Sequence, residues 1–392
     1  MFFSILSFSF FGLLLGILTG ITPGLHPNTI SLLVFGYLVF DPMLTSVLIV
    51  STAVSHTFFD FIPSIFLGAP NPDTALSVLP GHDMMMKGLG YEAIYLTAVG
   101  GVVSLSIVSV LLPIISIFIK MFYGLIRNNI HWILIFIVIY MLLRDRKFFG
   151  FVSLGLSGIL GLIVLNNNMF GNNIIFPMLT GLFGTSAILY SMRAGKEIPT
   201  QRKELGSLNS KNILLGGLIG SISGIITGLL PGIGAAQATF LSQEVIGRRN
   251  NKMFMVAIGG VNTTVAIFSL FSLWLIGTPR SGVSIVIEKL ITFGLNEIII
   301  FSGIILLVSA ISAILTIILS KKIIELFRKI KYRTVNLFTL LLIITLVFIL
   351  SGMYGVLILM LSTAIGMISI LSGTRRTYLM GCLLLPTILF FL

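Results

Sequence analysis

The segment Gly16-Ile17-Leu18-Thr19-Gly20-Ile21-Thr22-Pro23-Gly24 returns in the second half of the chain as Gly224-Ile225-Ile226-Thr227-Gly228-Leu229-Leu230-Pro231-Gly232. Each copy lies inside an apolar stretch and ends in Pro-Gly, which interrupts a helix. Inside a bilayer such an interruption is tolerated only where protein or a watery cavity satisfies the freed backbone groups. Matched interruptions in two halves of a chain are typical of a transport site.

The composition indicates that the chain works inside a membrane. Hydrophobic residues make up 56% of its 392 residues and charged residues only 9%. Apolar runs near the roughly 20 residues needed for a membrane helix recur along the whole length, whereas barrel strands would alternate over about 10 residues. We therefore predict an all-α, multi-pass protein of the cell membrane.

The excess of basic residues has two interpretations. The chain carries 24 Lys and Arg against 12 Asp and Glu, a net charge of +12. Such an excess is typical of basic cytoplasmic loops beside anionic lipid, and it would also favour an anionic substrate. No nucleic-acid partner is expected. Cys382 is the single cysteine, which excludes an internal disulfide and a cysteine-based metal site.

The two halves repeat one order of segments, a Pro-Gly-broken hairpin followed by about five transmembrane helices. An odd number of crossings would turn the second copy upside down, so we predict inverted repeats. The predicted segments are 3–40, 44–68, 93–119, 129–143, 148–165 and 173–191, then 212–247, 253–277, 295–320, 334–351, 352–372 and 377–392. The first inverted repeat then spans 1–192, a basic cytoplasmic linker 193–211, and the second inverted repeat 212–392.

The positions of the basic residues fit this topology. Those at 144–147, 193–211, 248–252, 321–333 and 375–376 all fall on one side, which the positive-inside rule makes cytoplasmic. The exceptions on the other side are Lys120, Arg127, Arg280 and Lys289.

The two Pro-Gly loops are the predicted substrate site. After each break, backbone amides at the start of the next half-helix can point at an anion, and neighbouring side chains offer hydrogen bonds. The candidate residues are Pro23, Gly24, His26, Asn28 and Thr29 in the first loop, and Pro231, Gly232, Gly234, Gln237 and Thr239 in the second. The alternative is a packing kink in which glycine lets helices approach closely.

A second pair of helix breaks is followed, in one copy, by an arginine. Leu67-Gly68-Ala69-Pro70 is matched by Ile276-Gly277-Thr278-Pro279, and Arg280 follows the second break. A guanidinium there is a candidate bidentate ligand for a substrate carboxylate. An exposed loop arginine is the alternative.

His56 and Asp60 are candidates for binding the coupling ion. They are spaced i, i+4 within segment 44–68, and ionisable groups at membrane depth are functional candidates by default. The matching part of the second half has Asn262, Thr263 and Thr264, and Thr263 completes the predicted coupling-ion or proton residues. The alternative is a neutral, hydrogen-bonded histidine with Asp60 near the interface.

Enzyme signatures are absent from the sequence. The histidines are scattered, and there is no His-Glu-x-x-His, no Walker motif and no Gly-x-Ser-x-Gly. We therefore predict no enzymatic activity, no ATP drive within this chain, and no cofactor other than a coupling cation, Na⁺ or H⁺.

Several motifs, in order, resemble the large membrane subunit of tripartite tricarboxylate transporters, over about residues 10–110 and 215–300. They are Gly16 to Pro27 for Gly-x-x-x-Gly-x-x-Pro-Gly-x-x-Pro, Gly68-Ala69-Pro70, Thr74-Ala75-Leu76, Lys87 to Ala93, Pro231-Gly232-Ile233-Gly234 and Gly277-Thr278-Pro279. Where this family usually has a glycine-rich Tyr-Gly-Gly-Ser-type stretch, this chain has Ser55-His56-Thr57-Phe58-Phe59-Asp60.

The resemblance implies a secondary active transporter for di- or tricarboxylates that is driven by a cation gradient. It also implies a small membrane subunit and an extracytoplasmic binding protein as partners. Two other readings stay open. Polyprenyl-phosphate translocases also use inverted repeats with paired Pro-Gly loops, and an intramembrane enzyme or scaffold is the third possibility.

Overall fold

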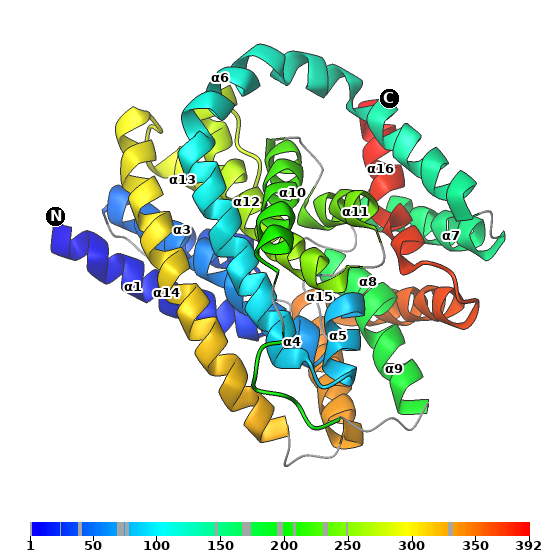
Figure 1. The fold of residues 1–392 in the computed structure, drawn as a ribbon. Helices are drawn as coiled ribbons and strands as arrows, with labels where there is room; N and C mark the ends of the chain where they lie inside the picture. Colours follow the sequence, from blue (N-terminus) through cyan, green and yellow to red (C-terminus); the bar gives the residue numbers. More distant parts are fainter. Residues whose placement is uncertain are drawn as a thin grey trace.

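The computed structural model describes residues 2–23, 25–37, 41–68, 74, 78–145, 148–166, 174–193, 199–206, 209–229, 234–247, 250–327 and 332–392. The regular elements among them are all helical (Figure 1). They are α1 (Phe2–Ile21), α2 (Pro27–Tyr37), α3 (Pro42–Phe59), α4 (Phe61–Phe66), α5 (Val78–Met86), α6 (Gly90–Asp145), α7 (Phe148–Leu165), α8 (Ile175–Leu179), the π-helix η3 (Thr180–Thr185), α9 (Ser186–Arg193), α10 (Ser210–Leu229), α11 (Ala235–Ile246), α12 (Asn251–Ile276), α13 (Gly282–Leu290), α14 (Leu295–Phe327), α15 (Tyr332–Leu371), the 3-10 helix η4 (Arg376–Met380) and α16 (Gly381–Phe391).

The helices are those of a multi-pass membrane protein. Eight helical segments among the described residues are long and apolar enough to cross a bilayer. Their outer faces carry large exposed apolar side chains, such as Phe10 on α1 and Ile314 on α14. A bilayer rather than water suits such a surface, because lipid accepts apolar side chains but not unpaired backbone. The predicted all-α, polytopic class is therefore confirmed.

The first helix of each half packs on the third helical segment through a row of glycines. On α1, a Cβ added to Gly16 would lie 2.4 Å from Ser55 Cβ of α3. On α10, a Cβ added to Gly224 would lie 2.6 Å from Thr264 Cβ of α12. Small residues let helices approach to backbone contact in a membrane. The duplicated glycines thus make the same helix contact in both halves.

The two halves are interlocked rather than side by side. The long helix α6 of the first half packs along α12, and α14 of the second half packs along α3. One large core therefore combines the front portions of both halves, with side chains from α3, α4, α6, α12 and α14. A second core combines their rear portions, namely the end of α6 with α7, α8, η3, α15, η4 and α16, together with α11 from the front of the second half. Each packed body is built from both halves of the sequence.

Helix α6 joins these two bodies. Figure 1 shows it rising beside α14, bending over the top of the view and descending toward α7 and α16. The sequence separates spans at 93–119 and 129–143, whereas the backbone stays helical between them. Pro113 lies inside this helix, where its ring and missing N–H favour a bend. In α15, by contrast, the predicted boundary at 351/352 is a real break, because Gly352 has φ 61°.

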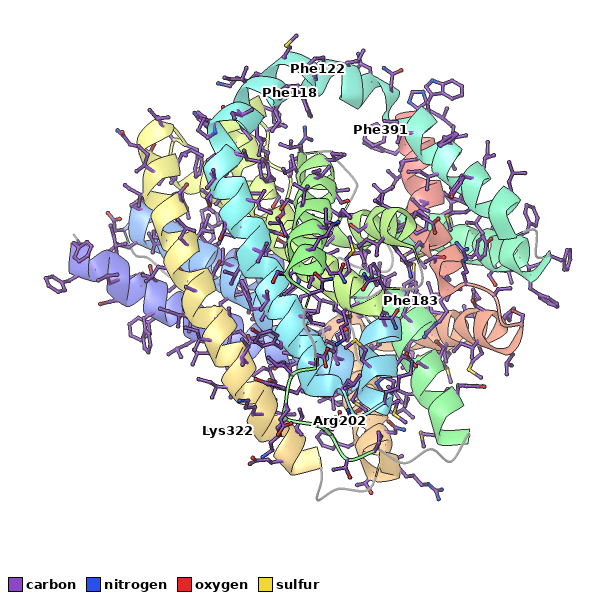
Figure 2. The ribbon with its side chains drawn as sticks, in the orientation of Figure 1. Phe118, Phe122, Phe183, Arg202, Lys322 and Phe391 are labelled. Atoms are coloured by element: carbon purple, nitrogen blue, oxygen red, sulfur yellow. The ribbon has the colours of Figure 1, made fainter. Side chains whose placement is uncertain are left out.

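Basic residues gather at two ends of the molecule. At one end Lys252 binds Glu92, Lys203 binds Glu325, and Lys321 lies over the Tyr91 ring. Arg202 and Lys322 lie at this same lower end of the view in Figure 2. At the other end Lys120 lies over Trp274 and Lys289 over Phe35. These residues belong to the two groups that the predicted topology assigned to opposite faces of the membrane, whereas Arg376 of the predicted cytoplasmic group is buried against η3.

Residues 199–206 of the predicted linker lie against the corner between α5 and α6. The Gln201 amide donates to the carbonyls of Met85 (2.8 Å) and Pro199 (2.9 Å) and accepts from the Gly90 amide (3.0 Å). Arg202 N donates to the carbonyl of Gly88, whose φ is +79°. The segment is thus a strap held by buried hydrogen bonds.

We expect Gln201→Leu to destabilise the protein, because it leaves the Gly90 amide buried without its acceptor and leaves the Met85 carbonyl with only the Gly88 amide as a donor. The expected loss is about 2 kcal/mol or more in the free energy of unfolding. Thermal unfolding of the purified protein in detergent measures it. Lys203→Leu is the control, because an exposed ion pair is worth about 0–1 kcal/mol. Equal melting temperatures for the two variants would contradict the strap.

Candidate functional site

The first Pro-Gly loop is shaped by His26. Helix α1 ends at Ile21, and α2 begins at Pro27, which has no N–H to satisfy. The His26 Nδ1 atom accepts a hydrogen bond from the Asn28 amide (3.2 Å), and the His26 carbonyl accepts from Ile30 (3.3 Å). His26 therefore caps α2, with Nδ1 as the acceptor. Gly24 lies outside the described residues, as does the Thr29 side chain.

Asn28 joins the start of α2 to the start of α13. Its Oδ1 atom accepts from the Val283 amide (3.1 Å), and a Cβ on Gly282 would lie 2.8 Å from Asn28 Cβ. Ser281 and Ser284 form a capping box at the start of α13. Two helix N-termini, each with a partial positive charge, thus meet at Asn28.

Arg280 lies directly before α13. Its backbone amide donates to Ser284 Oγ (2.9 Å), and its guanidinium donates to the hydroxyl of Tyr123 on α6 and lies over that ring. The side chain is therefore held between elements of the two halves rather than extended into solvent. Its charge adds to the positive field of the two N-termini, an arrangement suited to an anion.

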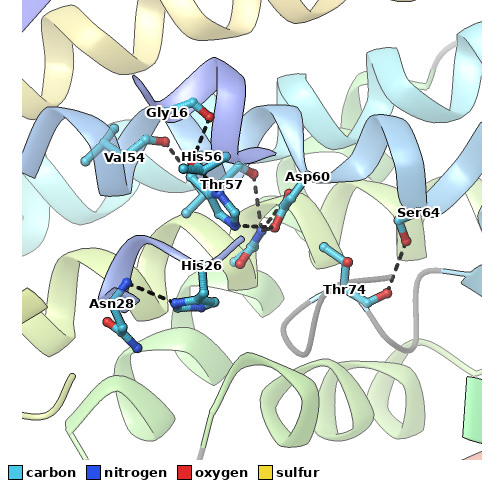
Figure 3. Close-up of polar contacts among 11 residues, drawn as sticks. Gly16, His26, Asn28, Val54, His56, Thr57, Asp60, Ser64 and Thr74 are labelled. Atoms are coloured by element: carbon cyan, nitrogen blue, oxygen red, sulfur yellow. Dashed lines mark hydrogen bonds and ion pairs between the residues drawn. The ribbon is translucent and has the colours of Figure 1, made fainter. Parts of the chain in front are cut away.

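His56 and Asp60 lie where α3 meets α4, and both are buried (Figure 3). His56 Nε2 is 3.8 Å from Asp60 Oδ2, and His56 Nδ1 is 3.0 Å from Thr19 Oγ1 of α1. The rings of His56 and His26 are 5.6 Å apart between centroids. The ionisable pair therefore directly adjoins the first Pro-Gly loop.

Asn262 of α12 reaches the same carboxylate from the second half. Its Nδ2 atom donates to Asp60 Oδ2 (2.9 Å), Asp60 Oδ1 (3.2 Å) and the Thr57 carbonyl (3.2 Å). The adjacent Thr263 instead donates to the Gly259 carbonyl (3.2 Å) and packs at Gly101 of α6. The sequence aligned Asn262 with this region, but only the fold shows that it, and not Thr263, contacts Asp60.

The second Pro-Gly loop is described in part. Pro231, Gly232 and the Gln237 side chain lie outside the described residues. Gly234 precedes α11, and its carbonyl accepts from the Ala238 amide (3.3 Å). Thr239 is buried on α11, and its hydroxyl has no partner among the described residues. Pro23 is buried in the first loop.

The comparisons with known proteins agree with the residues quoted above. A model of the tripartite tricarboxylate transporter TctA family matches residues 6–381. An uncharacterized protein of Methanocaldococcus jannaschii is 32% identical over 393 residues, covering 97% of each chain. No solved structure matches the chain. A family match over nearly the whole length means that this chain belongs to the tripartite tricarboxylate transporter TctA family.

Proposed function

We propose that this chain is the membrane permease of a secondary transporter that carries a small organic anion, a di- or tricarboxylate, coupled to a cation. The transport role is inferred from the family to which the chain belongs. The observation that supports an anionic substrate is that the N-termini of α2 and α13 meet at Asn28, with Arg280 in the loop that precedes α13. Carboxylate oxygens are natural ligands for helix N-termini and for a guanidinium.

The proposed mechanism is alternating access in a protein built of inverted repeats, with the anion held between the two Pro-Gly loops. The repeated glycine contact of α1 on α3 and α10 on α12 supports the duplication. The separation of basic residues toward two ends supports the orientation. Because each core mixes both halves, we infer that the two packed bodies move against each other, rather than one repeat against the other.

Partner subunits follow from the family, whose transporters are tripartite. We propose a small membrane subunit and an extracytoplasmic binding protein that delivers the carboxylate. A transporter of this kind needs no ATP site and no catalytic residues in this chain.

Ligand-dependent thermal stabilisation tests the proposal. A ligand that binds only the folded state raises its stability by RT ln(1 + [L]/Kd). Citrate, succinate, inorganic phosphate and a short polyprenyl phosphate are compared on the purified protein. We expect stabilisation by a carboxylate. Stabilisation by the polyprenyl phosphate alone would replace the proposal with a lipid-carrier translocase.

Arg280→Gln is expected to weaken the binding of that carboxylate at least about tenfold, because it removes a charge-assisted hydrogen bond worth about 1.5–3 kcal/mol. The readout is the citrate concentration that gives half-maximal stabilisation. Lys289→Gln is the matched control, since this cation lies at the same end but over Phe35. Unchanged citrate affinity in folded Arg280→Gln would remove Arg280 from the site.

A further inference from the structure

Asp60 is a carboxylate buried within a membrane span. It is 0% exposed and lies inside the apolar segment Pro42–Phe66. An isolated charge there is strongly unfavourable, so such a group is paired, protonated or functional. Its partners include His56 and Asn262, one from each half of the chain.

The hydrogen bonds fix the roles of the atoms around Asp60. Asn262 Nδ2 faces three acceptor oxygens, so it is the amide NH₂, and the carboxylate accepts from it. When the Thr19 hydroxyl donates to the Gly16 carbonyl (3.1 Å), it accepts from His56 Nδ1 at 3.0 Å. In this arrangement His56 Nδ1 carries a proton.

With Nδ1 protonated, a neutral His56 turns the lone pair of Nε2 toward Asp60 Oδ2, 3.8 Å away. Two lone pairs facing each other repel. One additional proton, on Nε2 or on Oδ2, turns this contact into an attraction, and the pair then has no net charge. When that proton leaves, the buried pair has a net charge of −1.

The surroundings fit a proton better than a sodium ion. Sodium is a hard cation that is best bound by several oxygen ligands, as are calcium and magnesium. The contacts of the Asp60 carboxylate described above come from nitrogens, His56 Nε2 and the Asn262 NH₂ group. The NH₂ group takes one lone-pair position on each carboxylate oxygen, which leaves fewer positions for a metal ion.

Among the described side chains of the elements packed against α3, His26 is a further titratable group in contact with the pair, through its ring contact with His56. Helices α1, α2 and α4 contain no Asp, Glu, Lys, Arg or His.

The other acidic, basic and histidine side chains described on or next to the packed helices have contacts elsewhere or are exposed. They are Glu92 with Lys252, Lys120 over Trp274, His131 beside Trp132, Arg280 with Tyr123, Lys289 over Phe35, Glu297 with the Gly294 amide, Lys321 over Tyr91, Glu325 with Lys203, and the exposed Glu288 and Lys322. On α5, which packs against α4, His82 contacts the Ile65 carbonyl and Asp83 pairs with Lys87.

The pair is present in one half only. Gly16 and Gly20 of α1 contact Ser55 and Phe59, while Gly224 and Gly228 of α10 contact Thr264 and Phe268. In this register the places of His56 and Asp60 are taken in α12 by Val265 and Ser269. Only one proton-binding pair of this kind is thus expected per chain.

We propose that the coupling cation is a proton bound between His56 and Asp60. Its release leaves a net charge of −1 at the Asp60–Asn262 contact, which joins the two halves. This proposal rests on the proposed function for its role in transport, but the proton site itself does not. The proton moves between water and the Nε2–Oδ2 contact, and no other bond changes. The charged, proton-free pair favours a conformation in which Asp60 reaches water.

The test uses the purified full chain without any substrate. If the proposal holds, the folded pair still carries its proton where a free histidine has lost it, so stability falls as pH rises through that range. We expect a lower melting temperature at about pH 7.5 than at about pH 5.5. Asp60→Asn and His56→Gln should each reduce this difference. Asp83→Asn, an exposed aspartate paired with Lys87 on α5, should retain it.

The second arm adds citrate, with and without sodium, at both pH values. In the wild type we expect citrate stabilisation to depend on pH and not on sodium, with citrate affinities at the two pH values that differ about tenfold. In Asp60→Asn we expect this difference between the two pH values to disappear. Citrate stabilisation that depends on sodium would contradict the proposal that the coupling cation is a proton. The same pH dependence of melting in wild type and Asp60→Asn overturns the site, whether or not citrate binds. If no carboxylate stabilises the protein but Asp60→Asn changes the pH dependence of melting, the proposed function is overturned and the proton site is retained.

Discussion

Arg376→Leu is expected to prevent the second core from assembling. Arg376 is 7% exposed, and its guanidinium donates to the carbonyls of Leu182 and Phe183 and to Ser186 Oγ (3.0 Å). These acceptors belong to the π-helix η3 and the start of α9, where the widened turn frees carbonyls for an outside donor. Leucine would remove the guanidinium donor from the Phe183 carbonyl and leave Ser186 Oγ as the side-chain donor to the Leu182 carbonyl.

A hydrogen bond from a charged donor contributes about 1.5–3 kcal/mol, so the loss of several such bonds removes a large part of the stability of a typical protein. We therefore expect Arg376→Leu to yield little monodisperse protein on size-exclusion chromatography after extraction in detergent. Lys322→Leu, at an exposed position at the lower end of Figure 2, is the control and should behave as the wild type. If both variants were equally monodisperse and melted together, the guanidinium would not hold η3.

Gly259→Ala is expected to force apart α6 and α12, the helices that join the two halves of the larger core. A Cβ at Gly259 would lie 2.0 Å from the Thr97 carbonyl oxygen, and one at Gly100 would lie 2.0 Å from the Val256 carbonyl oxygen. These contacts are reciprocal and involve backbone, so no side-chain rotation relieves them. Overpacking of this kind costs about 1–3 kcal/mol and sometimes more.

The measurement is the melting temperature of Gly259→Ala in detergent, with Gly303→Ala as the matched control. Gly303 lies within helix α14, and a Cβ there meets nothing within 4 Å. Alanine is favoured over glycine in a helix by about 0.5–1 kcal/mol, so the control should melt at or slightly above the wild-type temperature. A Gly259→Ala protein as stable as the control would mean that the two helices are not in backbone contact.

Much of the fold is readable from the sequence because a bilayer imposes local rules. Every spanning segment must be apolar and satisfy its own backbone, so hydropathy alone locates the helices, including the boundary at Gly352. The connection near Arg127 is harder to predict from the sequence. Its polar residues lower the hydropathy, but they do not prevent a helix, and α6 runs through them.

The candidate site was readable only in part. The i, i+4 spacing put His56 and Asp60 on one helix face, and the structure finds them 3.8 Å apart between Nε2 and Oδ2. Asn262 is an ordinary polar residue in the sequence, and nothing local distinguishes it from Thr263. Arg376 was grouped with the basic cytoplasmic residues, yet it is buried against η3. Which carbonyls or carboxylates a side chain meets depends on helices distant in sequence.

The sequence by itself determined the membrane location, the helical class, the duplicated Pro-Gly segments and the family, because apolar length, helix breaks and motif order are properties of short stretches. The tertiary structure decided how the halves combine: α6 crosses α12 at Gly100 and Gly259, Asn262 meets Asp60, and two cores mix both repeats. These contacts depend on close packing between segments far apart in the chain, where the distance between two backbones decides which side chains can touch.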